Sequence, residues 1–332
     1  ELGSLQIVLA RHFGFCYGVE NAIEIAFKTV EQYPDKKIFL LSEMIHNPFV
    51  NDDLIQRGVQ FLMDTKGNTL ISFDTLTKDD IVIIPAFGTT IDIENKLRSI
   101  GIQIEQYNTT CPFVEKVWNR AEQIALKGYS IVVHGKPSHE ETRATFSHSD
   151  VHAPTVVIND MNEAVVLSEF ILGQRPSSDF YQTFKGRFSE GFDIEKDLIK
   201  FGVVNQTTML ASDTQAIADY LKSIVIKKYS LDQSNSENHF ADTRDTLCYA
   251  TNDNQTAVSN LLKHPADIAI VIGGRKSSNS SHLVELCEEK LPTYFIQSEE
   301  DILSSSKIKC FNWRTHEEYS TEHYLPSKTK PV

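Results

Sequence analysis

The strongest constraint on the fold is a regular alternation of short apolar strand patterns with amphipathic helix patterns along the 332 residues. Strands followed by helices at this rhythm predict α/β units with parallel sheets. The predicted strands cover residues 5–10, 37–42, 79–87, 129–135, 155–160, 199–204, 266–274, 292–297 and 307–312. The predicted helices cover residues 21–33, 48–58, 89–101, 112–126, 161–172, 209–224, 254–263 and 280–290.

The rhythm restarts twice, so we predict three α/β domains without a sequence repeat. The first covers residues 1–110, with packing of its opening strand on the third domain as an alternative. The second covers residues 111–245 and carries a polar, irregular insertion at 173–200 that we expect to be exposed. The third covers residues 246–332. We expect residues 230–245 to be a linker, and residues 315–332 contain no convincing closing element.

Composition excludes several classes of protein. Apolar residues are 41% and charged residues 23%, which is typical of a globular chain rather than a disordered one. The net charge of −13 disfavours nucleic acid or an anionic membrane as the main partner, but allows a small anion in a locally positive pocket. No apolar run approaches the ~20 residues that span a bilayer, and the first residues lack a signal-peptide pattern. Since an initiator Met is absent, we expect that upstream residues have been removed.

Five cysteines are present, widely spaced and without a C-x-x-C pair, which argues against disulfides and zinc ribbons. Cys287 and Cys310 lie in apolar patterns and are predicted to be buried. Cys16, Cys111 and Cys248 lie where elements change, and Cys111 should have a lowered pKa because it begins a helix. Two interpretations stay open: three unrelated buried thiols, or an iron–sulfur cluster with three thiolate ligands and one open iron.

Polar clusters follow four predicted strands, where open α/β sheets bind ligands. They are His46–Pro48, His134–Thr142, Asn205–Thr208 and Gly273–Ser281. The last opens a helix, so it predicts an anion site. The structural alternatives are helix capping by Thr207 or Thr208, a flexible serine-rich turn, and surface or capping roles for the histidines. The histidines that we expect to have only such roles are His148, His152, His264, His316 and His323.

Seven stretches together resemble the 4-hydroxy-3-methylbut-2-enyl diphosphate (HMBPP) reductase family, in its plastid and cyanobacterial branch. They are GFCYGV, HNPFV, TTCPFVEKVW, HGKPSHEETRAT, NQTTM, DTLCYAT and GGRKSSNSSHL. The resemblance implies three α/β domains in a trefoil around a central [4Fe–4S] cluster. It places Cys16, Cys111 and Cys248 on the three family ligands of that cluster.

The resemblance also implies the activity, which is reductive dehydroxylation of HMBPP to isopentenyl and dimethylallyl diphosphates. Glu141 matches the family's proton-relay glutamate, and Thr207 matches its hydroxyl-contacting threonine. The residues that match its diphosphate-binding set are His46, His139, Ser277, Ser278 and Asn279. The implied electron donor is a small ferredoxin or flavodoxin, and the implied location is the bacterial cytoplasm or the plastid stroma.

Two positions depart from the family pattern. Phe87 stands where many bacterial members have a diphosphate-binding histidine, so its side chain cannot bind phosphate. The family's C-terminal Ser-Gly-Ala-Ser-type loop is not found before Val332, and we expect a truncated or divergent tail. Two other classes remain as alternatives: a non-catalytic iron–sulfur sensor or electron carrier, and a metal-free α/β protein with structural thiols.

Overall fold

The computed structural model of the chain describes residues 5–231, 235–241 and 246–325. These residues form two compact units. The smaller unit contains residues 5–15, 46–49 and 249–325, and the larger unit contains the others, from residue 16 to residue 248. The mixed α/β class predicted from the sequence is confirmed by the elements described below. The division into three domains and their trefoil arrangement stay predictions.

The first part of the larger unit contains a parallel sheet in the order β2-β1-β3. Its strands are β1 (Ile38–Leu40), β2 (Gln60–Phe61) and β3 (Ile81–Ile83). The helical elements of this part are α1 (Tyr17–Gln32), α2 (Pro48–Gln56), α3 (Ile91–Ile100), η1 (Phe73–Thr75) and η2 (Ile104–Tyr107). Leu40 and Ile83 pack with α1 on one face, and Phe39 and Val82 pack with Leu97 on the other. Burial on both faces explains the continuous apolar runs in these strands.

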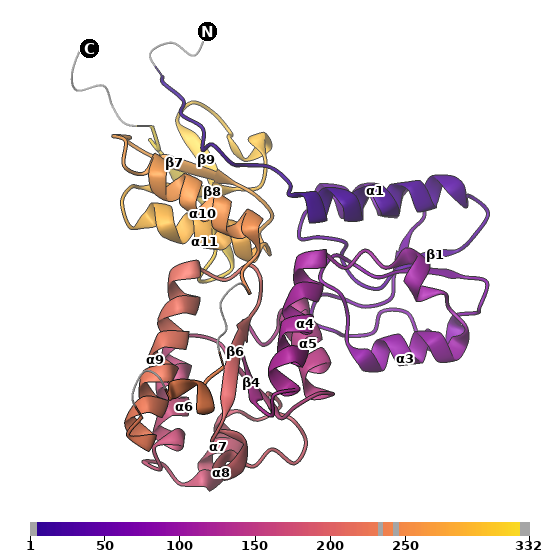
Figure 1. Cartoon of the computed structure of the whole chain (residues 1–332). Helices are drawn as coiled ribbons and strands as arrows, with labels where there is room; N and C mark the ends of the chain where they lie inside the picture. The colour runs from indigo at the N-terminus through magenta and orange to yellow at the C-terminus, as the bar shows by residue number, and fades with distance from the viewer. Residues whose placement is uncertain (1–4, 232–234, 242–245, 326–332) are drawn as a thin grey trace. The chain divides into compact units, whose positions relative to one another are not determined.

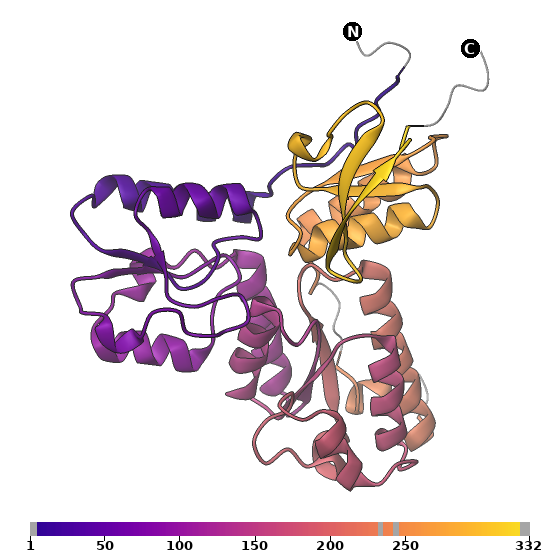
Figure 2. The ribbon, with the colours of Figure 1, turned by 180° about the vertical axis from the view of Figure 1, so that it is seen from behind.

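The second part of the larger unit contains a parallel sheet in the order β5-β4-β6. Its strands are β4 (Ser130–His134), β5 (Thr155–Ile158) and β6 (Phe201–Asn205). The helices are α4 (Pro112–Ala125), α5 (Glu140–Asp150), α6 (Met161–Ile171), α9 (Ala211–Tyr229) and the 3₁₀ helix η3 (Ser236–Asn238). In both views α4 and α5 lie side by side, as do α6 and α9 (Figures 1 and 2). The sequence analysis missed α5, because its sequence has few apolar residues.

Most residues of the predicted insertion at 173–200 are exposed, as expected, but the stretch is not irregular. This stretch forms α7 (Ser177–Thr183) and α8 (Ile194–Asp197). Phe180, Phe184 and Phe192 are fully or almost fully buried in the core beside α6 and α9. Polar residues lie between these aromatic residues, so the sequence analysis did not detect an apolar face. Burial of that face stabilises the segment.

The linker predicted at 230–245 is also wrong within the described residues. Phe240 is buried and forms an isolated bridge with Phe201 of β6, which attaches the segment to the sheet. Residues 232–234 and 242–245 lie outside the described part of the chain.

The smaller unit contains two two-stranded sheets. The strands β7 (Ala269–Ile272) and β8 (Thr293–Ile296) are parallel, and β9 (Lys307–Asn312) and β10 (Glu317–Glu322) are antiparallel. The helices are α10 (Tyr249–Leu261), α11 (Ser278–Glu288) and η4 (Glu299–Asp301). The strand β10 corrects the expectation that residues 315–332 hold no closing element. Since β10 is almost entirely exposed, it lacks the apolar alternation that would have revealed it.

The prediction of a buried strand at residues 5–10 is wrong. This segment pairs with no strand among the described residues, and Leu5, Ile7, Val8 and Leu9 are exposed. Apolarity alone does not make a strand, because the backbone also needs a hydrogen-bonded partner. The tail that the sequence analysis expects to be truncated or divergent lies, from residue 326 on, outside the described residues. No described helix is both long enough and apolar enough to cross a membrane.

Candidate active site

Three cysteines begin helices at the site. Cys16 is the N-cap of α1, Cys111 is the N-cap of α4 with Pro112 at the first helical position, and Cys248 directly precedes α10. All three belong to the larger unit. The charges of Cys16 and Cys248 both raise the pKa of Cys111, so both thiols lie within electrostatic range of the Cys111 thiol. The structure therefore brings together residues that are 95 and 137 positions apart in the sequence.

The predicted lowering of the Cys111 pKa is wrong. Burial, together with the charges of the neighbouring Cys248 and Cys16, raises the pKa of this thiol to about 11. The backbone N–H groups of Phe113 and Val114 do lower it, as expected at a helix N-terminus, but burial outweighs them. Thiolates gathered here therefore need a compensating positive charge, which a bound metal supplies.

Gly18 leaves room for the Cys111 thiol. A Cβ atom built on Gly18 would lie 2.4 Å from the Sγ atom of Cys111, so only glycine fits at this position. The N–H of Cys111 donates a hydrogen bond of 3.0 Å to the carbonyl oxygen of Ala86, which holds the start of α4. Three thiols within electrostatic range, with a glycine beside that of Cys111, are a donor set whose chemistry fits an iron–sulfur cluster.

We expect Gly18→Ala to reduce the iron bound per chain at least twofold, although it removes no ligand. The added methyl group must displace α1 or the Cys111 side chain, since 2.4 Å is far inside van der Waals contact. The measurement is iron and sulfide per chain after anaerobic purification. Glu20→Ala, on the first turn of the same helix, is the control and should keep wild-type iron. Wild-type iron in Gly18→Ala would show that the glycine is not needed.

Glu141 and Thr207 form the second part of the site. The backbone N–H of Thr207 donates to Oε1 of Glu141 at 2.5 Å, and both side chains are at least 95% buried. Glu141 lies in the first turn of α5, where its charge is favoured by the helix dipole. The N–H of Glu141 donates to Nδ1 of His139, the N-cap of α5, at 3.2 Å. His139 therefore caps a helix, which is the structural role that the sequence analysis gave as the alternative to ligand binding.

The amide side chains beside Thr207 hold its loop in place. Oε1 of Gln206 accepts hydrogen bonds from the N–H of Lys136 at 3.1 Å and from Oγ1 of Thr142 at 3.0 Å. Oδ1 of Asn205 accepts from Oγ1 of Thr246, two residues before Cys248. The alternative of helix capping by Thr207 or Thr208 is wrong, because α9 starts only after Leu210. The NQTT motif identified this loop in the sequence. No sequence signal showed that the Asn205 and Gln206 side chains would hold the loop by hydrogen bonds.

The smaller unit holds the other predicted substrate contacts. A Cβ atom on Gly274 would lie 1.6 Å from the carbonyl oxygen of His46, so glycine lets these two loops meet. Oγ of Ser277 accepts the N–H of Ser280 at 3.2 Å and caps α11, so the segment is an ordered helix start rather than a flexible turn. Oγ of Ser278 and Oδ1 of Asn279 are buried and make no hydrogen bond within the described residues. The Ser278 hydroxyl can donate, so at this helix N-terminus it suits an anionic ligand, whereas Oδ1 of Asn279 can only accept a hydrogen bond.

The predicted site residues thus fall into two groups. The larger unit holds Cys16, Cys111, Cys248, His139, Glu141 and Thr207, and the smaller unit holds His46, Ser277, Ser278 and Asn279. The roles that the sequence analysis gave these residues stay predictions. The two remaining cysteines, Cys287 and Cys310, are buried as predicted, and burial raises the pKa of both thiols.

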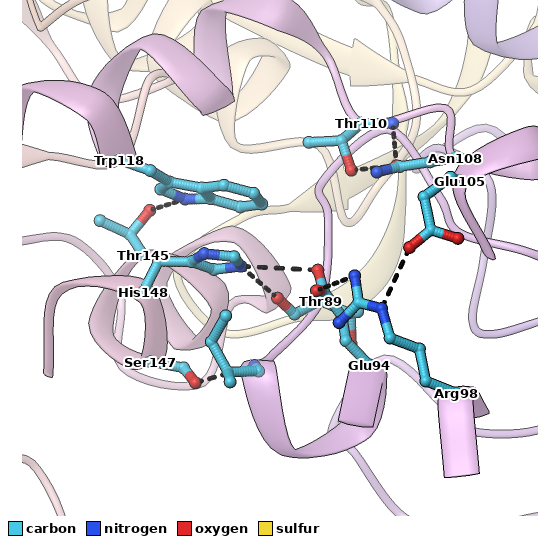
Figure 3. A network of polar contacts seen from close by, with 11 residues as sticks. Thr89, Glu94, Arg98, Glu105, Asn108, Thr110, Trp118, Thr145, Ser147 and His148 are labelled. Atoms are coloured by element: carbon cyan, nitrogen blue, oxygen red, sulfur yellow. Dashed lines mark hydrogen bonds and ion pairs between the residues drawn. The ribbon is translucent and has the colours of Figure 1, made fainter. Parts of the chain in front are cut away.

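A polar network joins α3, α4 and α5 within the larger unit (Figure 3). The rings of Trp118 and His148 are stacked with centroids 3.6 Å apart. Nε1 of Trp118 donates to Oγ1 of Thr145 at 3.2 Å, and Nε2 of His148 lies 3.1 Å from the carbonyl oxygen of Thr89. His148 is therefore a packed network residue, and the expectation of a surface or capping role is wrong.

The network makes the stability depend on pH. Burial lowers the pKa of His148 to about 4, against an ordinary value of 6.5. Below pH 6.5 the unfolded chain gains a proton that the folded chain does not accept until about pH 4, so the free energy of unfolding falls across that window. Nearby charges are Arg98 and His152, which lower this pKa slightly, and Glu94, whose own pKa is raised by burial.

We expect His148→Gln to lose less stability than the wild type between pH 7.5 and pH 5, by about 1–2 kcal/mol after allowance for partial exposure. Glutamine keeps an N–H donor for the carbonyl oxygen of Thr89 but does not titrate. The measurement is urea unfolding of both proteins at both pH values. Equal pH-dependent losses would contradict the assignment.

The fold and the site define a class of protein: an α/β protein in which three cysteines precede helices and a buried glutamate accepts a hydrogen bond from the backbone N–H of a threonine. The family model described as LytB protein matches residues 7–313. The chain belongs to the LytB family.

Curated relatives support this assignment. The 4-hydroxy-3-methylbut-2-enyl diphosphate reductase of Crocosphaera subtropica is 40% identical over 308 residues, which cover 92% of this chain and 74% of the relative. The protein of the same name from a Cyanothece species is 37% identical over 93% of this chain and 74% of the relative.

Two solved structures share the fold. One is the E-1-hydroxy-2-methyl-but-2-enyl-4-diphosphate reductase of Plasmodium falciparum, with a TM-score of 0.65 and 22% identity, covering 87% of this chain and 75% of the other. The other is an (E)-4-hydroxy-3-methyl-but-2-enyl diphosphate reductase, described as the terminal enzyme of the non-mevalonate pathway. It has a TM-score of 0.56 and 23% identity and covers 89% of this chain and 87% of the other.

Proposed function

We propose that this chain is an iron–sulfur oxidoreductase that reduces HMBPP to isopentenyl and dimethylallyl diphosphates. The observation that carries the proposal is the gathering of Cys16, Cys111 and Cys248 in the unit that also holds the Glu141–Thr207 pair. The reaction adds two electrons and two protons to HMBPP, breaks its C–O bond to the hydroxyl and releases water.

The three cysteines would hold a [4Fe–4S] cluster. When bound, such a cluster supplies electrons and a Lewis-acidic iron with an open position. The chain's contribution is to bring three thiols from distant parts of the sequence together. Burial raises the pKa of Cys111, so binding of the cluster would release a proton from this thiol.

Glu141 would deliver the proton to the departing hydroxyl. The N–H of Thr207 fixes Oε1 of Glu141, and the cap at His139 fixes the helix turn that carries Glu141. A carboxyl group that is held in place at a reacting oxygen is an effective general acid. Thr207 would contact the substrate hydroxyl, as its family match implies.

The diphosphate would be bound by His46, His139, Ser277, Ser278 and Asn279. The buried, unbonded hydroxyl of Ser278 at the start of α11 supports this role. Imidazole, hydroxyl and amide donors, together with the α11 helix dipole, would bind the anionic ligand although the whole chain has a net charge of −13. We propose a small ferredoxin or flavodoxin as the electron donor, and the bacterial cytoplasm or the plastid stroma as the location.

The test is anaerobic purification with iron and sulfide assays and a visible spectrum, recorded with and without HMBPP. We expect a brown protein with about four irons per chain, a spectrum that responds to HMBPP, and turnover with a chemical reductant. A cluster without turnover would indicate a sensor or electron carrier instead. Colourless, iron-free protein from a host that assembles clusters would contradict the proposal.

A further inference from the structure

Phe87 contacts the ring of His139 directly. The two ring centroids are 5.3 Å apart and the ring planes are at 86°, an edge-to-face arrangement. Both residues belong to the larger unit. Phe87 cannot bind an anion with its side chain, so nothing in the proposed reaction yet explains why it lies against a residue of the diphosphate set.

The turn at residues 85–88 carries Phe87, and its first half is hydrogen-bonded to Cys111. The carbonyl oxygen of Ala86 accepts the hydrogen bond from the N–H of Cys111 at 3.0 Å. The N–H of Gly88 donates to the carbonyl oxygen of Pro85 at 2.9 Å, which closes the turn. Phe87 therefore lies at the tip of a closed turn, whose position is tied to a predicted cluster ligand.

The second half of the turn is held by the network of Figure 3. Gly88 has φ = +73°, and a Cβ atom there would lie 2.5 Å from the Trp118 ring, so the backbone packs directly on the indole. The carbonyl oxygen of Thr89 lies 3.1 Å from Nε2 of His148. Because both halves are held, the backbone position of Phe87 is fixed, and from it the ring reaches His139.

His139 is constrained from its other side. Nδ1 accepts the N–H of Glu141 at 3.2 Å, so the neutral ring carries its proton on Nε2. The residue is 8% exposed. The cap fixes the Nδ1 edge of the ring, and the Phe87 contact limits rotation of the ring about that bond.

We propose that Phe87 is a positioning residue that holds the His139 ring in the orientation in which this ring binds the diphosphate. The inference rests on the proposed function for the identity of the ligand. Phe87 acts only through His139 and makes no contact with the anion itself. Its removal should weaken diphosphate binding and change the chemical step little, which is the signature of lost uniform binding.

The variant is Phe87→Leu, which keeps an apolar side chain but removes the ring. We expect KM for HMBPP to rise roughly 3- to 10-fold with kcat within twofold, the effect typical of one aromatic contact. The Kd for inorganic diphosphate, measured by calorimetry on the holoenzyme, should rise by the same factor. Phe61→Leu, a partly buried phenylalanine in β2, is the control and should leave both constants within twofold. Phe87→Met serves as a second variant if the leucine variant unfolds.

The decisive comparison uses a His139→Asn background. Asparagine retains an N-cap for α5 but removes the imidazole. We expect Phe87→Leu to have no further effect on the diphosphate Kd in that background. A full additional loss there would overturn the proposal, as would wild-type affinity in Phe87→Leu or no diphosphate binding by the wild type. Diphosphate binding without HMBPP turnover would refute the proposed function and leave this inference standing.

Discussion

Glu141→Gln is expected to lower the turnover of HMBPP roughly 100- to 10,000-fold, the range that a positioned general acid contributes. Glutamine has the same shape, and its side-chain oxygen can still accept the N–H of Thr207, so the loop should keep its position. Only the transferable proton is lost. The measurement is steady-state turnover with a chemical reductant, together with iron per chain and the visible spectrum, both of which should remain those of the wild type.

Glu163→Gln is the matched control for this experiment. Glu163 is a partly buried carboxylate of the same unit that pairs with Arg187 at 2.7 Å and belongs to no predicted site. Its replacement should leave turnover within twofold. If Glu141→Gln lost the cluster absorbance, the carboxylate would have a structural role, and if it kept full turnover, another group would supply the proton.

Serine replacements at the three site cysteines should have the second largest effect. Cys16→Ser, Cys111→Ser and Cys248→Ser are each expected to reduce iron from about four per chain to less than one, and to abolish turnover. A serine hydroxyl is a harder and less acidic ligand than a thiol, so it does not replace a thiolate on iron. Iron and sulfide assays after anaerobic purification measure this directly.

Cys310→Ser separates loss of a ligand from general damage. Cys310 is 1% exposed in β9, so serine there buries a new hydroxyl and should cost stability, while iron per chain stays at the wild-type value. Normal iron in any one of the three site variants would remove that cysteine from the ligand set.

Local pattern was sufficient for most elements of the fold. Strands such as β3 are buried on both faces, so their apolar runs are continuous and easily found in the sequence. The helix α5 and the strand β10 were missed because neither has a regular apolar face. The segment 5–10 shows the converse, since its apolar pattern predicted a strand for which the described residues provide no partner.

The site shows the same division. The positions of Cys16, Cys111 and Cys248 at the starts of helices, and of polar clusters at strand ends, could be inferred from sequence. The pKa of Cys111 could not, because burial and the charges of the other two thiols act on it only after folding. The contact between Glu141 and Thr207 joins residues 66 positions apart, because β4 and β6 are neighbours in the sheet.

The sequence by itself determined the α/β class, the gathering of chemical groups at strand ends and, through its motifs, the family resemblance. Each of these depends on residue type and short spacing. Only the tertiary structure decided that Gly18 makes room for a thiol, that Gln206 and Asn205 support the Thr207 loop, and that Phe87 packs on His139. Such contacts join residues far apart in the chain, and their distances are set by how the sheets and helices pack.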